Sequence, residues 1–119
     1  MSEPSGLDYV QLALLGEAAA AGAAAVFVWD DDRNYVAVNE AACALVGLSR
    51  EELLRLRTGD LSPGRAAELV EDVQRRDVSS GRSTFSRSDG AEVEVEWVTF
   101  RTRVAGLPYM ASVCWPAAE

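Results

Sequence analysis

The sequence contains no lysine, histidine or isoleucine, and all eleven of its basic residues are arginine. Without histidine, the chain has no Ser-His-Asp or Cys-His catalysis, no usual zinc site and no histidine-ligated haem. Most of the scarce residue types have AT-rich codons, which indicates a GC-rich bacterial genome. The 19 acidic residues give a net charge of −8 at pH 7. Nucleic acid and anionic membranes are therefore poor electrostatic partners, because no basic stripe is present.

Cysteine and long apolar runs are also scarce. Cys43 and Cys114 do not have metal-ligand spacing, and we expect both to be reduced in a cytoplasmic protein. The acids at residues 30–32 fall in a predicted turn, where they are expected to face water rather than a metal. The longest apolar run, residues 18–29, is far short of the roughly 20 residues that a membrane-spanning helix needs. With 119 residues, the chain predicts a single folded domain.

The first half of the chain has clear helix and strand signals. A helix is predicted over residues 7–21, with Ser5 as N-cap, and two strands follow at 25–30 and 35–38. Asn39 is a good N-cap for a helix over 40–46, and Gly47 closes that helix. The next helix begins with a capping box that Ser49 and Glu52 form.

The second half is predicted to be mostly strand. A longer helix is expected from Pro63 to about Ser80, where Gly81 stops it. Three strands follow, at 83–87, 92–103 and 109–115, joined by turns at Asp89-Gly90 and at Gly106-Leu107-Pro108. The simplest closure is an α+β fold, in which a five-stranded antiparallel sheet carries helices on one face and an extra N-terminal helix. We expect residues 1–22 to form a capping or dimerisation helix, 23–116 the domain, and 117–119 a tail.

Alternation along the strands separates two faces of the sheet. Glu92, Glu94 and Glu96 face outward, and beyond Trp97 the apolar Val98 and Phe100 fall on that same outer face. This apolar surface needs a cover, which we expect the N-terminal helix to supply, either within the chain or across a dimer. The expected interface residues are Leu7, Val10, Leu14, Val98 and Phe100.

The inner face carries aromatic and apolar side chains. The strands contribute Phe27, Trp29, Val95, Trp97, Thr99, Met110, Ser112 and Cys114, and the helices contribute Ala42, Leu45, Val46 and Leu54. Two interpretations stay open. These side chains either fill a solid core or line a cavity for a flat or lipid-like apolar ligand. The candidate ligand-binding residues are Phe27, Trp29, Leu45, Leu54, Val95, Trp97, Met110 and Cys114.

Over about residues 23–115 the chain resembles a PAS (Per-ARNT-Sim) sensor domain. The resemblance depends on the order and spacing of Asp30, Asn39, Gly47, the stretch SREELL, Asp60-Leu61 and Asp89-Gly90. It implies a PAS fold and a role in bacterial signal transduction. Such domains bind a small ligand between the sheet and the helices, or mediate homodimerisation and protein–protein interaction. The resemblance therefore also implies a signalling partner, a kinase or a transcription regulator, that is either fused to the domain or a separate protein.

Two alternatives are kept beside that expectation. One is a ligand-free PAS module that only dimerises. The other is a small α+β-cone enzyme with a buried carboxylate, and it is the weaker because no acid falls on a predicted inner strand face. We therefore expect no catalysis. Pro116 stands where longer PAS receptors have the Asp of the junction to their output helix, so we expect a stand-alone unit rather than a piece cut from a receptor.

The PAS resemblance also bears on the cofactor. Thr58 stands where the flavin-photoadduct subfamily has its reactive cysteine, and Pro63 stands where that subfamily has a polar flavin contact. Cysteinyl-flavin photochemistry is therefore not expected, and the lack of histidine speaks against histidine-ligated haem. A non-covalent flavin, stacked on Trp29 or Trp97, and a lipid-like ligand stay open.

Overall fold

The computed structural model describes residues 9–58, 60, 75 and 77–117. The elements in chain order are α1 (Tyr9–Ala21), β1 (Ala25–Trp29), β2 (Tyr35–Val38), α2 (Glu40–Val46), α3 (Arg50–Leu53), β3 (Val78–Ser86), β4 (Glu92–Val104) and β5 (Leu107–Pro116). Among the described residues, no helix is long and apolar enough to cross a membrane.

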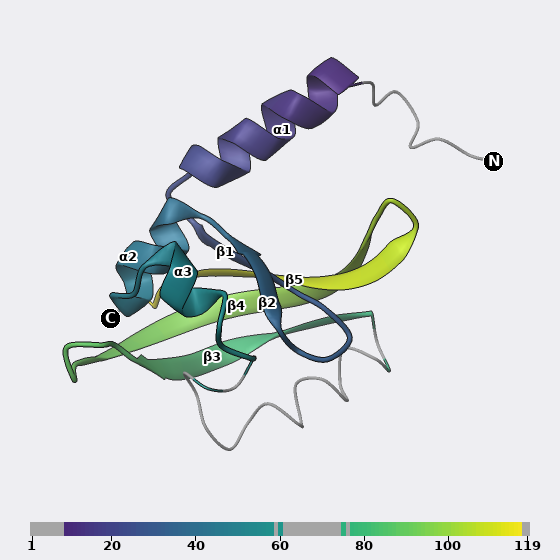
Figure 1. The fold of residues 1–119 in the computed structure, drawn as a ribbon. Helices are drawn as coiled ribbons and strands as arrows, with labels where there is room; N and C mark the ends of the chain where they lie inside the picture. Colours follow the sequence, from purple (N-terminus) through teal and green to yellow (C-terminus); the bar gives the residue numbers. More distant parts are fainter. Residues whose placement is uncertain (1–8, 59, 61–74, 76, 118–119) are drawn as a thin grey trace.

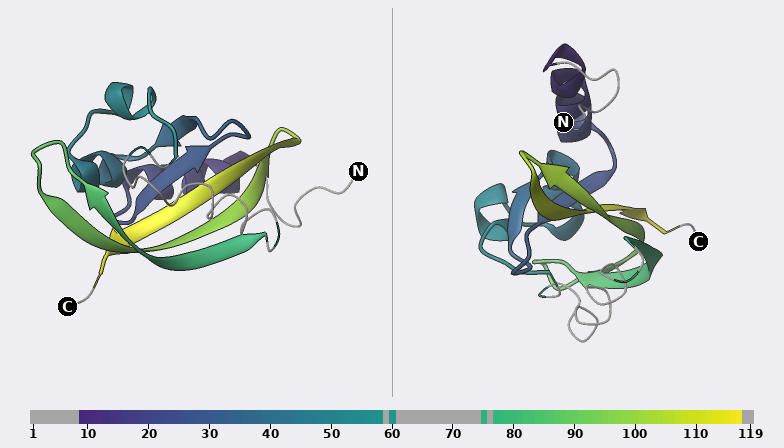
Figure 2. Two further views of the ribbon diagram at one scale, coloured as in Figure 1. Left: turned by 90° about the horizontal axis from the view of Figure 1, so that it is seen from below. Right: turned by 90° about the vertical axis from the view of Figure 1, so that its right-hand side faces the viewer.

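The five strands form one antiparallel sheet in the order β2-β1-β5-β4-β3. Helix α2 packs against β1 and α3 lies beside β2, so both cover the same side of the sheet (Figure 1). Helix α1 extends away from this body (Figure 2). The predicted α+β fold, with its additional N-terminal helix, is confirmed.

The predicted caps of the helices α2 and α3 are confirmed. The side chain of Asn39 accepts a hydrogen bond from the Ala42 N–H at the start of α2, and Gly47 ends that helix in the left-handed conformation, with φ +75°. Ser49 and Glu52 form both bonds of the capping box at α3. These side chains satisfy backbone groups that each helix end leaves without a partner.

The β4–β5 turn is tighter than predicted. Ala105 and Gly106 both have positive φ, as the two central residues of a type I′ hairpin require, and Val104 already pairs with Leu107. Leu107 and Pro108 therefore belong to β5, and their assignment to the turn is wrong. Proline is tolerated there because residues 107–109 of β5 lie beyond the last pair with β1, which is Met110 with Trp29, so one edge of β5 is unpaired at Pro108.

β3 differs most from the prediction. The predicted helix was to run to about Ser80 and stop at Gly81, but residues 78–86 form a strand. Gly81 lies opposite Trp97 in the ladder, and a Cβ there would come within 3.0 Å of Trp97 Cζ2. The glycine thus allows the indole to approach the backbone closely, and it does not end a helix. Pro63 and most of the predicted helix lie outside the described residues, as does Ser5.

Candidate functional site

The inner face of the sheet is the face that α2 and α3 cover. The strand register places Trp29 beside Met110, and Trp97 beside Cys114. All the strand residues predicted for this face therefore share it. Of the candidate ligand-binding residues, those fully enclosed are Phe27, Trp29, Val95, Met110 and Cys114.

Short hydroxyl side chains hold the two inner-face indoles. Trp29 Nε1 donates to Ser112 Oγ at 3.1 Å, and Ser112 Oγ lies 2.7 Å from Thr99 Oγ1. Trp97 Nε1 donates to Ser83 Oγ at 2.8 Å. Both indole N–H groups are therefore satisfied within the chain, which fixes the ring orientations without any ligand. The predicted inner-face pattern included Thr99 and Ser112, but their pairing with Trp29 was not foreseen.

Leu54, which was predicted to line the inner face, does not point toward it. Leu54 is 39% exposed, whereas its neighbour Leu53 is completely buried. α3 is a single turn, so a shift of one residue rotates a side chain by about 100° and turns it away from the core. The inner-face assignment of Leu54 is wrong, and Leu53 takes that place. Leu45 and Trp97 are half-buried and pack against the core.

Tyr35 and Thr58 belong to the same region, although the sequence pattern did not single them out as inner-face residues. The Tyr35 ring lies 5.4 Å from that of Phe27. Burial is the main cause that raises the pKa of the Tyr35 phenol well above its ordinary value. Thr58 Oγ1 is buried beside it and has no hydrogen bond of ordinary geometry to any described residue. Burial also raises the pKa of the Cys114 thiol to about 12, so this cysteine stays a neutral thiol.

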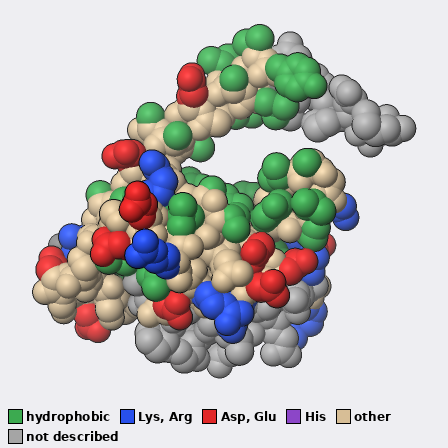
Figure 3. Space-filling model, in the orientation of Figure 1, with side chains coloured by type: hydrophobic (Ala, Val, Ile, Leu, Met, Phe, Trp, Pro, Cys, Tyr) green, Lys and Arg blue, Asp and Glu red, His purple; other side chains and the backbone are tan. Residues whose placement is uncertain are grey.

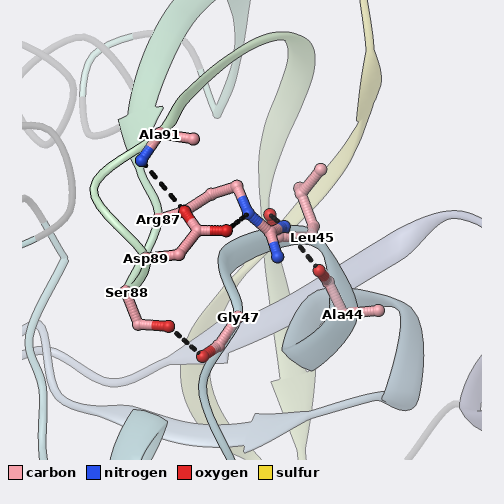
Figure 4. Close-up of polar contacts among 7 residues, drawn as sticks. All are labelled: Ala44, Leu45, Gly47, Arg87, Ser88, Asp89 and Ala91. Carbon is pink, nitrogen blue, oxygen red and sulfur yellow. Dashed lines mark hydrogen bonds and ion pairs between the residues drawn. The ribbon is translucent and has the colours of Figure 1, made fainter.

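A second polar cluster joins the β3–β4 turn to the end of α2 (Figure 4). Arg87 Nη1 donates to the carbonyls of Ala44 and Leu45 at 2.8 and 2.6 Å. Ser88 donates from its backbone to Val46 O and from its hydroxyl to Gly47 O. These bonds satisfy carbonyls that the end of a helix leaves free. No local signal reveals them, because the partners are more than 40 residues apart.

An open hollow of about 330 Å³ lies beside this cluster. It is lined by Ala23, Ala25, Ala41, Ala44, Leu45, Arg87, Val93, Cys114 and Pro116. Only Leu45 and Cys114 of these are candidate ligand-binding residues. No described group of three or more cysteine, aspartate or glutamate side chains is placed to hold a metal ion.

Asn39 connects α1 to the sheet. Its Oδ1 accepts from the N–H groups of Val26 and Ala42 at 2.9 and 3.0 Å. Its Nδ2 donates to the carbonyls of Ala19 and Ala24 at 2.6 and 2.9 Å. One buried amide therefore uses all four of its hydrogen-bonding positions to hold the end of α1, the start of β1 and the start of α2 together.

The opposite, outer face of the sheet carries an apolar surface, which we call the outer patch. By strand register it comprises Val26, Val28, Val78, Val98, Phe100, Val104, Leu107, Ala111, Val113 and Trp115. Val78, Val104, Leu107 and Trp115 are between 41 and 58% exposed. Predicted interface residues Val98 and Phe100 lie within this patch and are half-buried.

Helix α1 does not cover the outer patch within the chain. It has no buried residue, and predicted interface residues Val10 and Leu14 are 67 and 61% exposed. Of the two predicted ways to cover the sheet, the one within a single chain is therefore wrong. Figure 3 shows open space between α1 and the β4–β5 hairpin, with hydrophobic side chains on both sides. Leu7 lies outside the described residues.

Comparison with known proteins identifies relatives of this fold. A family profile of the PAS fold matches residues 19–106, whereas no curated protein matches the chain. The solved PAS domain of a two-component sensor histidine kinase is 17% identical, with a TM-score of 0.80 over 91% of this chain and 97% of that one. A domain of a sensory box sensor histidine kinase/response regulator from Geobacter sulfurreducens is 23% identical, with a TM-score of 0.79 over 89% and 94%. The LOV domain of a blue-light activated histidine kinase from Erythrobacter litoralis is 16% identical, with a TM-score of 0.69 over 81% and 97%. At these identities the likeness concerns the fold alone.

Proposed function

The chain belongs to the PAS family, and on that basis we propose that it is a non-catalytic sensory module that signals by forming a homodimer. The observation that carries the proposal is the pair of uncovered apolar surfaces, α1 and the outer patch. Both surfaces belong to one chain, so a second copy supplies a cover for each. An isolated helix of 13 residues is marginal in water, and contact with a partner would stabilise α1.

The signalling output of such a dimer would pass to another protein. Solved relatives come from a two-component sensor histidine kinase and a sensory box sensor histidine kinase/response regulator. We therefore propose a kinase or transcription regulator, separate or fused, as the partner in a bacterial cytoplasm. The charge of −8 and the lack of a basic stripe favour a protein partner over nucleic acid.

A small apolar ligand on the inner face is the second candidate function. The contacts would come from Phe27, Trp29, Leu45, Val95, Trp97, Met110 and Cys114, around a non-covalent flavin or a lipid-like molecule. The buried Thr58 hydroxyl, which has no hydrogen bond of ordinary geometry to the residues that the structure describes, favours a ligand that offers one polar group. The internal hydrogen bonds of both indoles favour the alternative, a ligand-free dimerisation module. We place ligand binding second for that reason.

Sedimentation velocity of three glutamate variants tests dimerisation; two of the variants change the proposed interface and the third is a control. Leu14→Glu on α1 and Phe100→Glu in the outer patch are expected to give monomers, because each places a charge in an apolar interface. Leu54→Glu is the matched control, since Leu54 is exposed on the helix side of the sheet. It is expected to leave the dimer intact. If all three variants keep the wild-type dimer, the interface is not where we propose.

The ligand is tested separately by organic extraction of the purified chain, followed by mass spectrometry and an absorption spectrum. Flavin would give a visible absorption band, and a lipid would give mass without colour. Trp97→Phe is expected to lower the amount of extracted ligand while the chain stays folded. A clean extract from a dimeric protein, and no change in the melting temperature with added flavin or fatty acid, would favour the ligand-free module.

A further inference from the structure

The open hollow of about 330 Å³ lies at one end of the inner face, away from the β4–β5 hairpin. Its strand residues are the first of β1, the second of β4 and the last of β5, which are Ala25, Val93 and Pro116. Helix α2 forms another wall with Ala41, Ala44 and Leu45. At about 30 Å³ for each water-sized group, the hollow has room for roughly ten heavy atoms.

The hollow is distinct from the enclosed core of the inner face. The aromatic side chains of Phe27, Trp29 and Trp97 do not line it. Its innermost residues are Ala25 and Cys114, which are 3 and 2% exposed. The Cys114 thiol is neutral, since burial raises its pKa to about 12. The hollow therefore offers apolar contacts on most sides, and a molecule there would not require the core to open.

Arg87 supplies the one charge among the described residues that line the hollow. Its guanidinium is held in place, because Nη1 donates to the carbonyls of Ala44 and Leu45 at 2.8 and 2.6 Å (Figure 4). Its Nη2 makes no hydrogen bond to any residue that the structure describes. A Cβ on Gly47 would come within 3.2 Å of Nη2. Because glycine has no Cβ, one end of the fixed guanidinium stays open to a further partner.

Asp89 offsets the charge of Arg87 only in part. Its Oδ2 lies 3.4 Å from Arg87 Nε, and its side chain is 61% exposed. Its Oδ1 accepts from the Ala91 N–H at 2.9 Å, so the turn holds the carboxylate on the solvent side. Exposed ion pairs contribute little, because water and salt screen them. A carboxylate that meets Nη2 from an apolar hollow would be screened less, so Arg87 favours an anion at its open end.

We propose that the hollow binds a small monocarboxylic acid with an apolar body. The carboxylate accepts from Arg87 Nη2, and the body packs against Leu45, Val93 and the alanines. The arginine favours an acid over an amine, and the apolar walls favour a hydrocarbon or aromatic body over a sugar. The site does not depend on the proposed homodimer, because neither α1 nor the outer patch lines it. With the candidate ligand site on the inner face it shares only Leu45 and Cys114.

Calorimetric titration of the full chain with octanoate, whose size matches the hollow, tests the proposal, and octanol is the neutral counterpart. We expect octanoate to bind one site per chain with a Kd below about 1 mM. Octanol should bind about tenfold more weakly, because it lacks the charge that Arg87 recognises.

Three variants identify the site. Arg87→Gln should weaken octanoate about tenfold and leave octanol unchanged, since only the acid uses the guanidinium charge. Ala44→Leu should weaken both molecules, because Ala44 is exposed on α2 and a longer side chain there fills the hollow. Arg82→Gln is the matched control and should change neither affinity, since Arg82 pairs with Glu94 outside the hollow. Melting temperatures show whether each variant is folded.

Other results would overturn the proposal. Octanoate that gives no saturable heat at millimolar concentration would mean that the hollow is not a site for such acids. Equal affinities for octanoate and octanol, or equal losses in Arg87→Gln and Arg82→Gln, would show that Arg87 does not recognise the acid. Binding that Trp97→Phe abolishes and Ala44→Leu leaves unchanged would place the acid on the inner-face indoles instead. The homodimer is tested independently by sedimentation velocity, so its failure and the failure of this site are distinguishable.

Discussion

Replacing Asn39 tests how the N-terminal helix is attached to the domain. The Asn39 amide accepts from Val26 N and Ala42 N and donates to two carbonyls, one of them Ala19 O in α1. Asn39→Ala removes all four bonds at once. Loss of the helix cap costs about 1 kcal/mol. The partly buried N–H of Val26 loses its side-chain partner, which costs about 1–3 kcal/mol more. We expect the free energy of unfolding to fall by about 3 kcal/mol.

Asn39→Asp separates the two halves of this role. The remaining oxygen still accepts from Val26 N and Ala42 N, but the second oxygen now faces the carbonyls of Ala19 and Ala24. We expect α1 to be released while α2 stays capped. The introduced carboxyl would have a raised pKa in the folded chain. The Asn39→Asp variant is therefore most stable below about pH 4, where the carboxyl is protonated in both the folded and the unfolded chain. Its free energy of unfolding falls as the pH rises through the pKa of the carboxyl in the folded chain.

Urea denaturation followed by tryptophan fluorescence measures both variants, and Ser49→Ala is the control. Ser49 caps α3 with one local bond, so its loss should cost only about 1 kcal/mol. The reasoning is refuted if Asn39→Ala costs no more than Ser49→Ala, or if Asn39→Asp is equally destabilised at pH 4 and pH 7.

Three further predictions concern the sheet, the β3–β4 turn and the buried thiol. Gly81→Ala should destabilise by about 1–3 kcal/mol and shift tryptophan emission, because its Cβ would meet the Trp97 ring; an unchanged spectrum would contradict the close contact. Arg87→Ala should lower the free energy of unfolding by about 2 kcal/mol, since two carbonyls of α2 lose a charged donor that is partly exposed. Arg82→Ala, which removes an exposed pair with Glu94, should cost under about 1 kcal/mol, and equal losses would argue against the Arg87 role. Burial raises the pKa of Cys114 from 9.0 to about 12, so stability should fall as pH rises from 9 to 12. Cys114→Ala should reduce that slope, while the buried phenol of Tyr35, whose pKa is also raised, accounts for a remainder above pH 10; an identical slope would exclude the thiol as a cause.

Local signals predicted the parts of the fold that local chemistry decides. Asn39, Gly47 and Ser49 marked helix ends correctly, because caps act through bonds within a few residues. Strand alternation placed Trp97 and Cys114 on the same face, since the side-chain period of a strand is two. The same reasoning separated the outer patch from the inner face.

Contacts between segments that are distant in the sequence could not be predicted from these local signals. Gly81 was interpreted as a helix stop, although its absent side chain makes room for an indole in the neighbouring strand. The bonds from Arg87 to the end of α2 cross more than 40 residues, and neither segment alone reveals them. Leu54 was predicted for the core position that Leu53 occupies. The sequence pattern of a one-turn helix is too short to determine which of its side chains points to the core.

Native mass spectrometry of the purified chain tests the central claim most directly. We predict an assembly of about twice 12.8 kDa at micromolar concentration, which separates into single chains on denaturation. Leu14→Glu should give 12.8 kDa alone under the same conditions. A single chain of 12.8 kDa in the unmodified protein would contradict the account, because α1 and the outer patch would then stay uncovered in solution.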